Sequence, residues 1–179
     1  TGVPGKPGIV WTLDAATGDF LWATQTNYQN VITGVDVEKR QGITNPALDI
    51  TEIAQRKLVC PTTQGGINWN SVGYSPQSNF LYAPTNNTCM TFFLRPVDPV
   101  VGAHHQSAVS RPTVGPEDDG MVGLFSAVDV ASGEIRWQHK QRAGIGGSVL
   151  TTAGGLVFVS DAARRFRALD ADSGEILWE

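Results

Sequence analysis

The sequence has few of the residues from which metal centres are usually built. Its 179 residues include only two cysteines and three histidines, and none of these has the spacing of a zinc site. Charged residues make up 17% of the chain and leave a net charge of −4, so the basic face needed for binding nucleic acid is missing. No apolar run approaches the length of a membrane span. Neither a phosphate-binding loop nor a nucleophile–base pair is recognisable, and any catalysis would therefore depend on a bound cofactor.

Glycine and proline are abundant instead. Twenty Gly and ten Pro, together with five Trp, indicate many short strands joined by turns. Hydrophobic residues make up 41% of the chain, which is enough to bury a core and argues against disorder. The chain begins at Thr1 without a Met or a signal-peptide pattern and ends directly after a tryptophan, so we expect a piece of a longer protein.

A short pattern that occurs three times defines the fold class. Each copy has an aliphatic residue and an aspartate, then a glycine four residues after the aspartate and a tryptophan eight residues after it. The Asp-to-Gly stretch is typical of a tight turn, where Asx hydrogen bonding and a glycine at positive φ are both useful. A strand that carries the tryptophan follows. The copies are Asp14, Gly18 and Trp22; Asp129, Gly133 and Trp137; and Asp170, Gly174 and Trp178.

The spacing of the copies indicates a propeller. The last two lie 41 residues apart (170 − 129), a period that fits a four-stranded propeller blade, and no sustained helical apolar stripe is present. We therefore expect an all-β chain that forms a partial β-propeller of about three blades, each with four antiparallel strands. A generic β-sandwich with coincidental turns is the alternative. In the last blade we expect strands at 146–152, 155–160, 166–170 and 175–178.

Two insertions interrupt this regular spacing. The first two copies lie 115 residues apart (129 − 14), which is 74 more than one period (115 − 41). Alignment of the paired glycines at 65–66 and 146–147 divides the excess into two parts. The resulting single domain has a blade end at 1–23, an insertion at 24–64, a blade at 65–139 that contains the insertion 88–120, and a blade at 146–179. We expect an extra hairpin at 31–42 in the first insertion and a Pro-rich, lid-like loop with little regular structure in the second.

Both insertions are expected on one face of the propeller, because the turns of a meander alternate between its two ends. Lys6 precedes a strand at 9–14 and lies on the same face, and Asn68 lies near the start of an innermost strand, close to the same rim. Large loops and polar groups at one inner rim are typical of a ligand site. The stretch 60–76 is therefore the candidate centre of the function.

Each candidate residue also has a purely structural explanation. Cys60 and Cys89 would lie at one edge of neighbouring strands, where a disulfide is geometrically natural, and two free buried thiols are the alternative. In isolation Lys6 would be a solvated turn lysine, and Asn68 and Asn70 would satisfy backbone groups. We interpret the other polar clusters as surface features: His104 and His105 in an exposed loop, the turn 116–120, which lacks the ligand alternation of a calcium loop, and the charges of Arg164, Arg165 and Arg167.

Taken together, these motifs resemble the pyrroloquinoline quinone (PQQ) dependent alcohol and methanol dehydrogenases. The repeat is similar to their tryptophan-docking motif, in which each Trp packs its blade against the next in an eight-bladed propeller. The stretch KPGIVWTLD from Lys6 to Asp14 is similar to the segment whose leading Arg or Lys contacts the quinone oxygens. The next block matches in order and spacing: Cys60–Pro61, Gly65–Gly66 with Asn68, Tyr74 to Pro76, and Asn87 to Met90.

The resemblance implies a periplasmic enzyme that oxidises a small alcohol by hydride transfer to PQQ and passes electrons to a cytochrome c or another acceptor. It implies that Lys6 and Asn68 contact the quinone and that Cys60 and Cys89 form a disulfide. It also implies bound Ca²⁺ or a lanthanide, with metal ligands and a general-base Asp upstream of this chain, so no metal ligand or catalytic residue is assigned here. The remaining blades would be needed to close the ring, and we expect this fragment alone to be inactive.

One departure and one rival accompany this interpretation. Ile145 stands where methanol dehydrogenases have a Trp before the paired glycine, which weakens cofactor contacts from that blade and argues against a strict methanol dehydrogenase. The rival is a non-catalytic propeller with the same docking motif, such as the outer-membrane assembly scaffold that binds proteins. A sensor-domain propeller is a third possibility. Neither would be expected to combine Lys6, Asn68 and the two cysteines.

Overall fold

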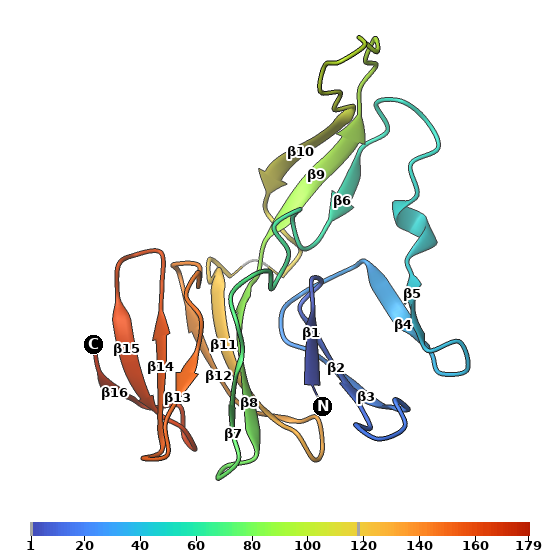
Figure 1. The fold of residues 1–179 in the computed structure, drawn as a ribbon. Helices are drawn as coiled ribbons and strands as arrows, with labels where there is room; N and C mark the ends of the chain where they lie inside the picture. The colour runs from blue at the N-terminus through green and yellow to red at the C-terminus, as the bar shows by residue number, and fades with distance from the viewer. Residues whose placement is uncertain (1, 118) are drawn as a thin grey trace.

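The computed structural model describes residues 2–117 and 119–179. Three antiparallel sheets stand side by side, and a further three-stranded sheet projects from one end of them (Figure 1). The described residues form strands, turns, loops and one short 3-10 helix, Pro46–Leu48, so the expected all-β class is confirmed. Among the described residues no helix is long and apolar enough to cross a membrane.

The middle and last of the three sheets are the expected four-stranded antiparallel meanders. Their strand orders are β12-β11-β8-β7 and β13-β14-β15-β16, and the first sheet has the order β1-β2-β3. The connection from β8 to β11 carries the second insertion, as the spacing of the repeats predicted. The bounds are β1 Gly2–Gly5, β2 Ile9–Leu13, β3 Phe20–Gln25, β7 Gly73–Ser75, β8 Phe80–Asn86, β11 Gly123–Asp129, β12 Ile135–Gln141, β13 Leu150–Thr151, β14 Leu156–Ser160, β15 Phe166–Asp170 and β16 Ile176–Trp178.

The first strand of the last sheet is shorter than expected. A strand at 146–152 was predicted, and only Leu150 and Thr151 form β13. Before it the chain follows β14 irregularly: Ile145 forms an isolated bridge with Asp161, and the Gly147 N–H donates to the Ser160 carbonyl at 3.3 Å. A side chain at 147 would collide with Ser160, so this close approach requires glycine and replaces a regular ladder.

The repeated tryptophans dock adjacent sheets onto one another. A Cβ built on Gly133 would lie 2.7 Å from Cδ2 of Trp22, and one built on Gly174 would lie 2.6 Å from Cδ2 of Trp137. The Trp137 indole also donates to the Ala171 carbonyl at 3.1 Å. Both glycines have positive φ, +79° and +74°. Gly133 and Gly174 therefore serve the turn and the close approach of the indole at once.

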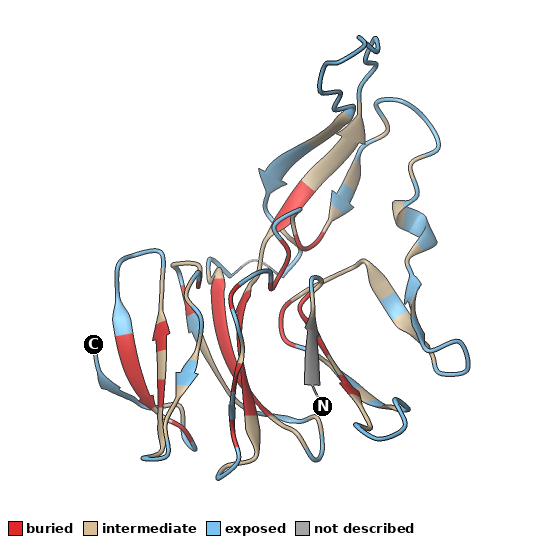
Figure 2. Ribbon diagram, viewed as in Figure 1, coloured by how far each residue is buried: buried red, intermediate tan, exposed pale blue. Residues whose placement is uncertain are grey.

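Two apolar clusters fill the spaces between the sheets. Figure 2 shows buried residues concentrated in the middle and last sheets, whereas the tip of the projecting sheet is exposed. Burial of these side chains is the main stabilising contribution to the stack of sheets. One cluster contains Val10, Leu81 and Ala83 with Trp22, and the other contains Tyr82, Phe125, Ala127, Ile145, Val157, Val159, Leu169 and Ala171 with Trp137.

The two insertions fold together into one sheet, which we call the insert sheet. It consists of β6 (Lys57–Val59), β9 (Cys89–Leu94) and β10 (Ala108–Thr113) in the order β10-β9-β6. The expectation of little regular structure in the second insertion was wrong, because its prolines tolerate a hairpin. Pro96 and Pro99 lie in the loop at its tip, and Pro112 lies on the edge strand β10, where one N–H can be missing. The predicted extra hairpin of the first insertion is present as β4 (Ile32–Asp36) and β5 (Gln41–Thr44).

Arg167 is buried, which corrects the interpretation of the arginine cluster as surface charge. Its side chain is 5% exposed and lies 3.3 Å from the Asp161 carboxylate, whose side chain is 2% exposed. It also lies 2.5 Å from Glu179 and donates to Gln141. Arg167 lies on β15, where three consecutive residues are buried, whereas Arg164 and Arg165 lie in the preceding turn and are exposed.

The remaining polar clusters lie at the surface. His104 and His105 are exposed, as expected, and Nε2 of His105 lies 2.8 Å from the Val100 carbonyl. In the turn 116–120 the side chains of Glu117 and Asp119 are exposed, and position 118 lies outside the described residues. Among the residues that the structure describes, no group of three or more His, Cys, Asp or Glu is arranged to hold a metal ion.

Candidate functional site

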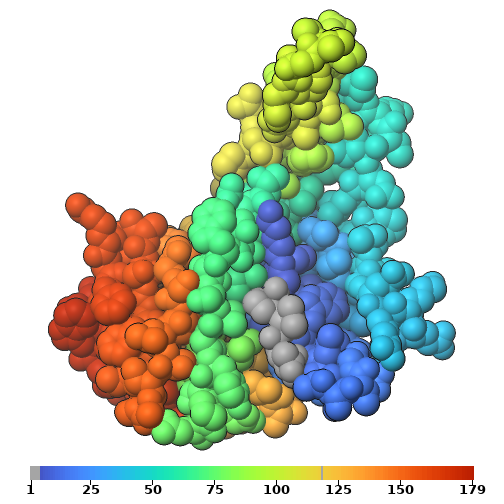
Figure 3. Space-filling view, viewed as in Figure 1, coloured from blue at the N-terminus to red at the C-terminus, as the bar shows by residue number. Residues whose placement is uncertain are grey.

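The predicted site residues meet where the insert sheet joins the three main sheets. Lys6 lies in the tight turn between β1 and β2, which is closed by a hydrogen bond from the Gly8 N–H to the Gly5 carbonyl at 2.8 Å. Asn68 lies in the segment 61–72, which leads from the foot of β6 to β7. In Figure 3 this segment, in green, lies beside the dark blue turn that precedes β2, on the front of the molecule. The chain thus brings together residues 62 positions apart (68 − 6).

Lys6 and Asn68 line two different hollows, and Gly65 lines both of them. A Cβ built on Gly65 would lie 2.6 Å from Cγ of Lys6 and 2.7 Å from its carbonyl oxygen, and Gly65 has a φ of +85°. The Gly66 N–H donates to the Lys6 carbonyl at 2.9 Å, which joins the two segments directly. The Lys6 side chain is exposed, and its ammonium group has no ion-pair or hydrogen-bond partner among the described residues. It is therefore available to a ligand.

Asn68 and Asn70 have different environments. Asn70 is buried, and its side chain satisfies backbone groups by donating to the Pro84 carbonyl at 3.3 Å and accepting from the Asn68 N–H at 3.3 Å. The Asn68 side chain is exposed and donates one hydrogen bond, to the Gln64 carbonyl at 2.9 Å. An amide has two N–H donors and one carbonyl acceptor, so Asn68 keeps hydrogen-bonding capacity for a ligand.

Two hollows flank this junction. One, of about 360 Å³, is lined by Lys6, Gly65 and neighbours in the segment 59–63. The other, of about 340 Å³, is lined by Gly65, Asn68 and Trp69, and Trp69 is 80% exposed. Thr62 and Gly65 belong to both. Among the described residues that line them, Lys6 is the only charged one, so this part of the chain supplies a cation and amide donors but no carboxylate base.

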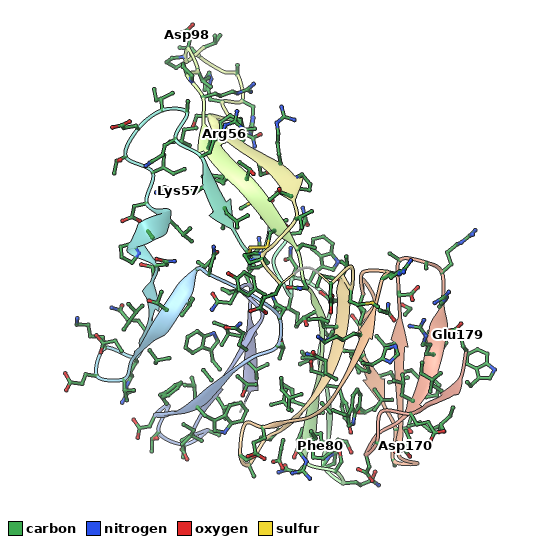
Figure 4. All side chains as sticks on the ribbon, turned by 180° about the vertical axis from the view of Figure 1, so that it is seen from behind. Arg56, Lys57, Phe80, Asp98, Asp170 and Glu179 are labelled. Carbon is green, nitrogen blue, oxygen red and sulfur yellow. A yellow bond between two sulfur atoms is a disulfide. The ribbon has the colours of Figure 1, made fainter. Side chains whose placement is uncertain are left out.

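A disulfide holds the insertions together next to the site. The sulfur atoms of Cys60 and Cys89 lie 2.02 Å apart and their Cα atoms 4.3 Å apart, and both residues are buried. Figure 4 shows this bond at the foot of the insert sheet. Of the two alternatives that the sequence left open, the structure has the disulfide rather than free thiols. The bond fixes the start of the segment that carries Asn68.

Asn86, which the sequence analysis did not single out, links the middle sheet to the last. Its Oδ1 accepts from the Ile145 N–H at 2.7 Å, and its Nδ2 donates to the Ile145 carbonyl at 2.9 Å. The Ile145 side chain is buried in the core between these sheets, and the neighbouring Gly144 and Gly146 line the hollow instead. The only available signal was an asparagine at the end of a strand, which is too common to be diagnostic.

Comparison with known proteins gives the chain its relatives. Residues 96–179, just under half of the chain, match a protein family described as outer membrane protein assembly factor BamB. Over 97% of its length the chain is 34% identical to the quinoprotein ethanol dehydrogenase of Pseudomonas aeruginosa and 28% identical to the lanthanide-dependent methanol dehydrogenase of Methylacidiphilum fumariolicum. It covers 29% of each of these relatives.

Solved structures agree with these relatives. A europium-containing methanol dehydrogenase superposes on 99% of this chain with a TM-score of 0.87 and 27% identity, and the match covers 31% of that protein. The quinohemoprotein alcohol dehydrogenase ADHIIG of Pseudomonas putida HK5 superposes with a TM-score of 0.77 and 25% identity, over 28% of its chain. The four-stranded sheets thus match part of a quinoprotein propeller. Over almost its whole length the chain is similar to quinoprotein alcohol and methanol dehydrogenases, and it spans about 30% of the length of the relatives it matches.

Proposed function

We propose that this chain is a part of a quinoprotein dehydrogenase that binds PQQ while an alcohol is oxidised. The observation that carries the proposal is that Lys6, the one cation among the described residues that line the two hollows, contacts Gly65, which also lines the hollow of Asn68. The relatives named above support it because their names include methanol and ethanol dehydrogenases. When bound, PQQ would supply the quinone carbonyl carbon that accepts a hydride from the alcohol.

The residues present fit such a cofactor. PQQ is a flat anion rich in carbonyl and carboxylate oxygens, and the site offers an ammonium group, an amide and a close backbone approach at Gly65. Lys6 would stabilise the negative charge that develops on a quinone oxygen, and Asn68 would donate a second oriented hydrogen bond. The general base and the ligands of the associated Ca²⁺ or lanthanide ion are expected elsewhere in the protein.

The proposal extends to the whole protein. We expect an eight-bladed propeller in the periplasm, in which the remaining blades complete the site and a cytochrome c or another acceptor takes the electrons. The disulfide between Cys60 and Cys89 is consistent with an oxidising compartment.

Activity of the full-length protein tests the proposal. Reconstituted with PQQ and with Ca²⁺ or a lanthanide, it is expected to reduce an artificial dye with primary alcohols. Lys6→Ala should lower kcat by about 100-fold, the usual effect of removing one donor to a developing oxyanion. Lys39→Ala is the matched control, because the Lys39 side chain is exposed and its ammonium group lies 3.2 Å from Asp36, away from both hollows. An absence of cofactor-dependent turnover across a panel of alcohols would reject the proposal.

A second candidate function is a non-catalytic scaffold that binds proteins. The match of residues 96–179 to the BamB family is the observation that favours it. That region contains two copies of the docking repeat but neither Lys6 nor Asn68, so the match concerns sheet packing rather than the site. A scaffold should not bind PQQ, whereas the proposed dehydrogenase should quench or shift the PQQ spectrum on mixing.

A further inference from the structure

Asn27 is a buried polar residue behind the site with no role in the proposal so far. It lies two residues after the end of β3 and is 4% exposed. Its Nδ2 donates to the Tyr28 carbonyl at 2.9 Å, which fixes the orientation of the amide. Its Oδ1 is buried and has no hydrogen-bond partner among the described residues. Since buried polar atoms are usually paired, the position of this oxygen calls for an explanation.

The Asn27 amide occupies the space that side chains at two glycines would fill. A Cβ built on Gly8 would lie 1.4 Å from Oδ1, and one built on Gly66 would lie 2.5 Å from Oδ1 and 2.7 Å from Nδ2. Gly8 follows Lys6 by two residues, and Gly66 precedes Asn68 by two residues. The amide thus lies between the turn that carries Lys6 and the segment that carries Asn68.

The residue before Asn27 anchors it to the body of the protein. The N–H and hydroxyl of Thr26 both donate to the Gly8 carbonyl, at 2.9 Å and 2.7 Å. The Thr26 carbonyl in turn accepts from Nε2 of Gln138 at 3.1 Å and from the hydroxyl of Thr85 at 3.4 Å, both on the middle sheet. The backbone next to Asn27 is therefore hydrogen-bonded both to the turn that carries Lys6 and to the middle sheet, which fixes the position of Asn27.

We propose that Asn27 is a positioning residue that sets the separation of Lys6 and Asn68, an inference that rests on the proposed function. Its amide fills the space between Gly8 in one segment and Gly66 in the other. The hydrogen bond to the Tyr28 carbonyl keeps the amide in the orientation in which it contacts both glycines. A smaller side chain would let the Lys6 turn collapse toward residues 65–66. Asn27 lines neither hollow, so it acts through the two segments and not on the cofactor.

A double-mutant cycle in the full-length protein tests the contact between Asn27 and Gly66 without any cofactor. Gly66→Ala is expected to lower the thermal unfolding midpoint, because the three atoms nearest to its new Cβ all belong to Asn27. Gly66 has no positive φ, so alanine there meets no backbone strain, unlike alanine at Gly8. Asn27→Ala combined with Gly66→Ala should regain much of the loss, since the added methyl group enters the vacated space. Additive losses would overturn the proposal.

PQQ affinity, measured by spectroscopic titration, tests the positioning role. Asn27→Ala should weaken PQQ binding about tenfold. This is the effect expected if displacement of Lys6 or Asn68 removes about one hydrogen bond to PQQ. The double variant should bind more tightly than Asn27→Ala alone. Tyr82→Phe is the control, because it removes a buried hydrogen bond to the Ala171 carbonyl at 3.1 Å far from the site and should leave affinity unchanged.

The outcomes separate the two proposals. If the wild-type protein binds PQQ and Asn27→Ala binds it equally well, the positioning role is wrong and the proposed function stands. If the wild-type protein does not bind PQQ, both proposals are wrong. Non-additive losses in the unfolding cycle would then show only that Asn27 and Gly66 pack against each other. Weakened binding together with rescue by the double variant supports both.

Discussion

At the scale of single residues, the buried pair of Arg167 and Asp161 shows how the last sheet is tied to the middle one. Asp161 accepts from the backbone N–H groups of Ala163 and Arg165 and from Gln141 on β12, while Arg167 reaches both Asp161 and Gln141. Burial alone would raise the pKa of Asp161. The backbone hydrogen bonds, the Arg167 guanidinium and Gln141 outweigh it and lower the pKa below its usual value of 3.8.

The first prediction concerns this carboxylate. Asp161→Asn keeps the shape but leaves Arg167 without its most buried partner, and it should cost roughly 3 kcal/mol of unfolding free energy at pH 7. Because the folded pKa lies below 3.8, the wild-type contribution is complete above that pH and is lost as the pH falls through the folded pKa. Denaturant unfolding at pH 7 and near pH 3 should therefore show a difference between the two proteins that narrows in acid.

Asp19→Asn is the control for that experiment. Asp19 pairs with Arg40 at 2.8 Å, but both side chains are 60% exposed. Such a pair contributes at most about 1 kcal/mol, so the control should change stability little at either pH. Equal losses of unfolding free energy for the two variants would mean that the buried pair of Arg167 and Asp161 stabilises the protein no more than an exposed pair does.

At the scale of elements, the docking of an indole onto the turn of the next sheet is what stacks the sheets. Trp137 on β12 contacts Phe125 and Tyr82 as well as Gly174, with ring centroids 5.5 Å and 5.8 Å away. Trp178 on β16 has the same place in its repeat, yet this residue is 58% exposed in this chain. The same residue type is therefore available in a packed and an unpacked setting.

The second prediction uses this contrast in the 179-residue chain. Trp137→Ala should lower the unfolding free energy by about 3–5 kcal/mol, because a large aromatic side chain is removed from between two sheets. Trp178→Ala should change it by less than about 1 kcal/mol, as is usual for exposed positions. Denaturant unfolding followed by circular dichroism measures both. A loss at Trp178 as large as that at Trp137 would contradict the docking account.

At the scale of the whole molecule, the disulfide joins the insert sheet to the main body. Cys60 directly follows β6 and Cys89 begins β9, so the bond closes the junction where both insertions leave the stacked sheets. It encloses the segment with Gly65, Gly66 and Asn68 in a loop with a sequence separation of 29. The bond therefore constrains the candidate site as well as the insert sheet.

The third prediction is that the double variant Cys60→Ser and Cys89→Ser loses about 3–4 kcal/mol, the chain-entropy contribution of a loop of this length. The loss should be local first: amides of β6 and β9 should exchange hydrogen faster, while those of β8 and β11 stay protected. A reducing agent should reproduce these changes in the wild-type chain and have no effect on the variant. Uniform loss of protection would show that the bond stabilises the main body instead.

Local chemistry determined much of this architecture from the sequence alone. The Asp-x-x-x-Gly turns, the following tryptophans and the 41-residue period predicted the four-stranded sheets, because turns and strand alternation are encoded in neighbouring residues. The same spacing located both insertions and placed Lys6 and Asn68 near one rim. It also brought Cys60 and Cys89 together, although it left open whether they would bond.

Only the tertiary structure decided how distant segments meet. The pairing of β6 with β9, the burial of Arg167, and the contacts of Asn86 with Ile145 and of Asn27 with Gly8 and Gly66 all join residues that no local pattern connects. Such contacts depend on the free energy of long-range packing and desolvation, which the order of neighbouring residues does not reveal. The sequence therefore predicted the sheets and the face of the site, and the packing between them determined its geometry.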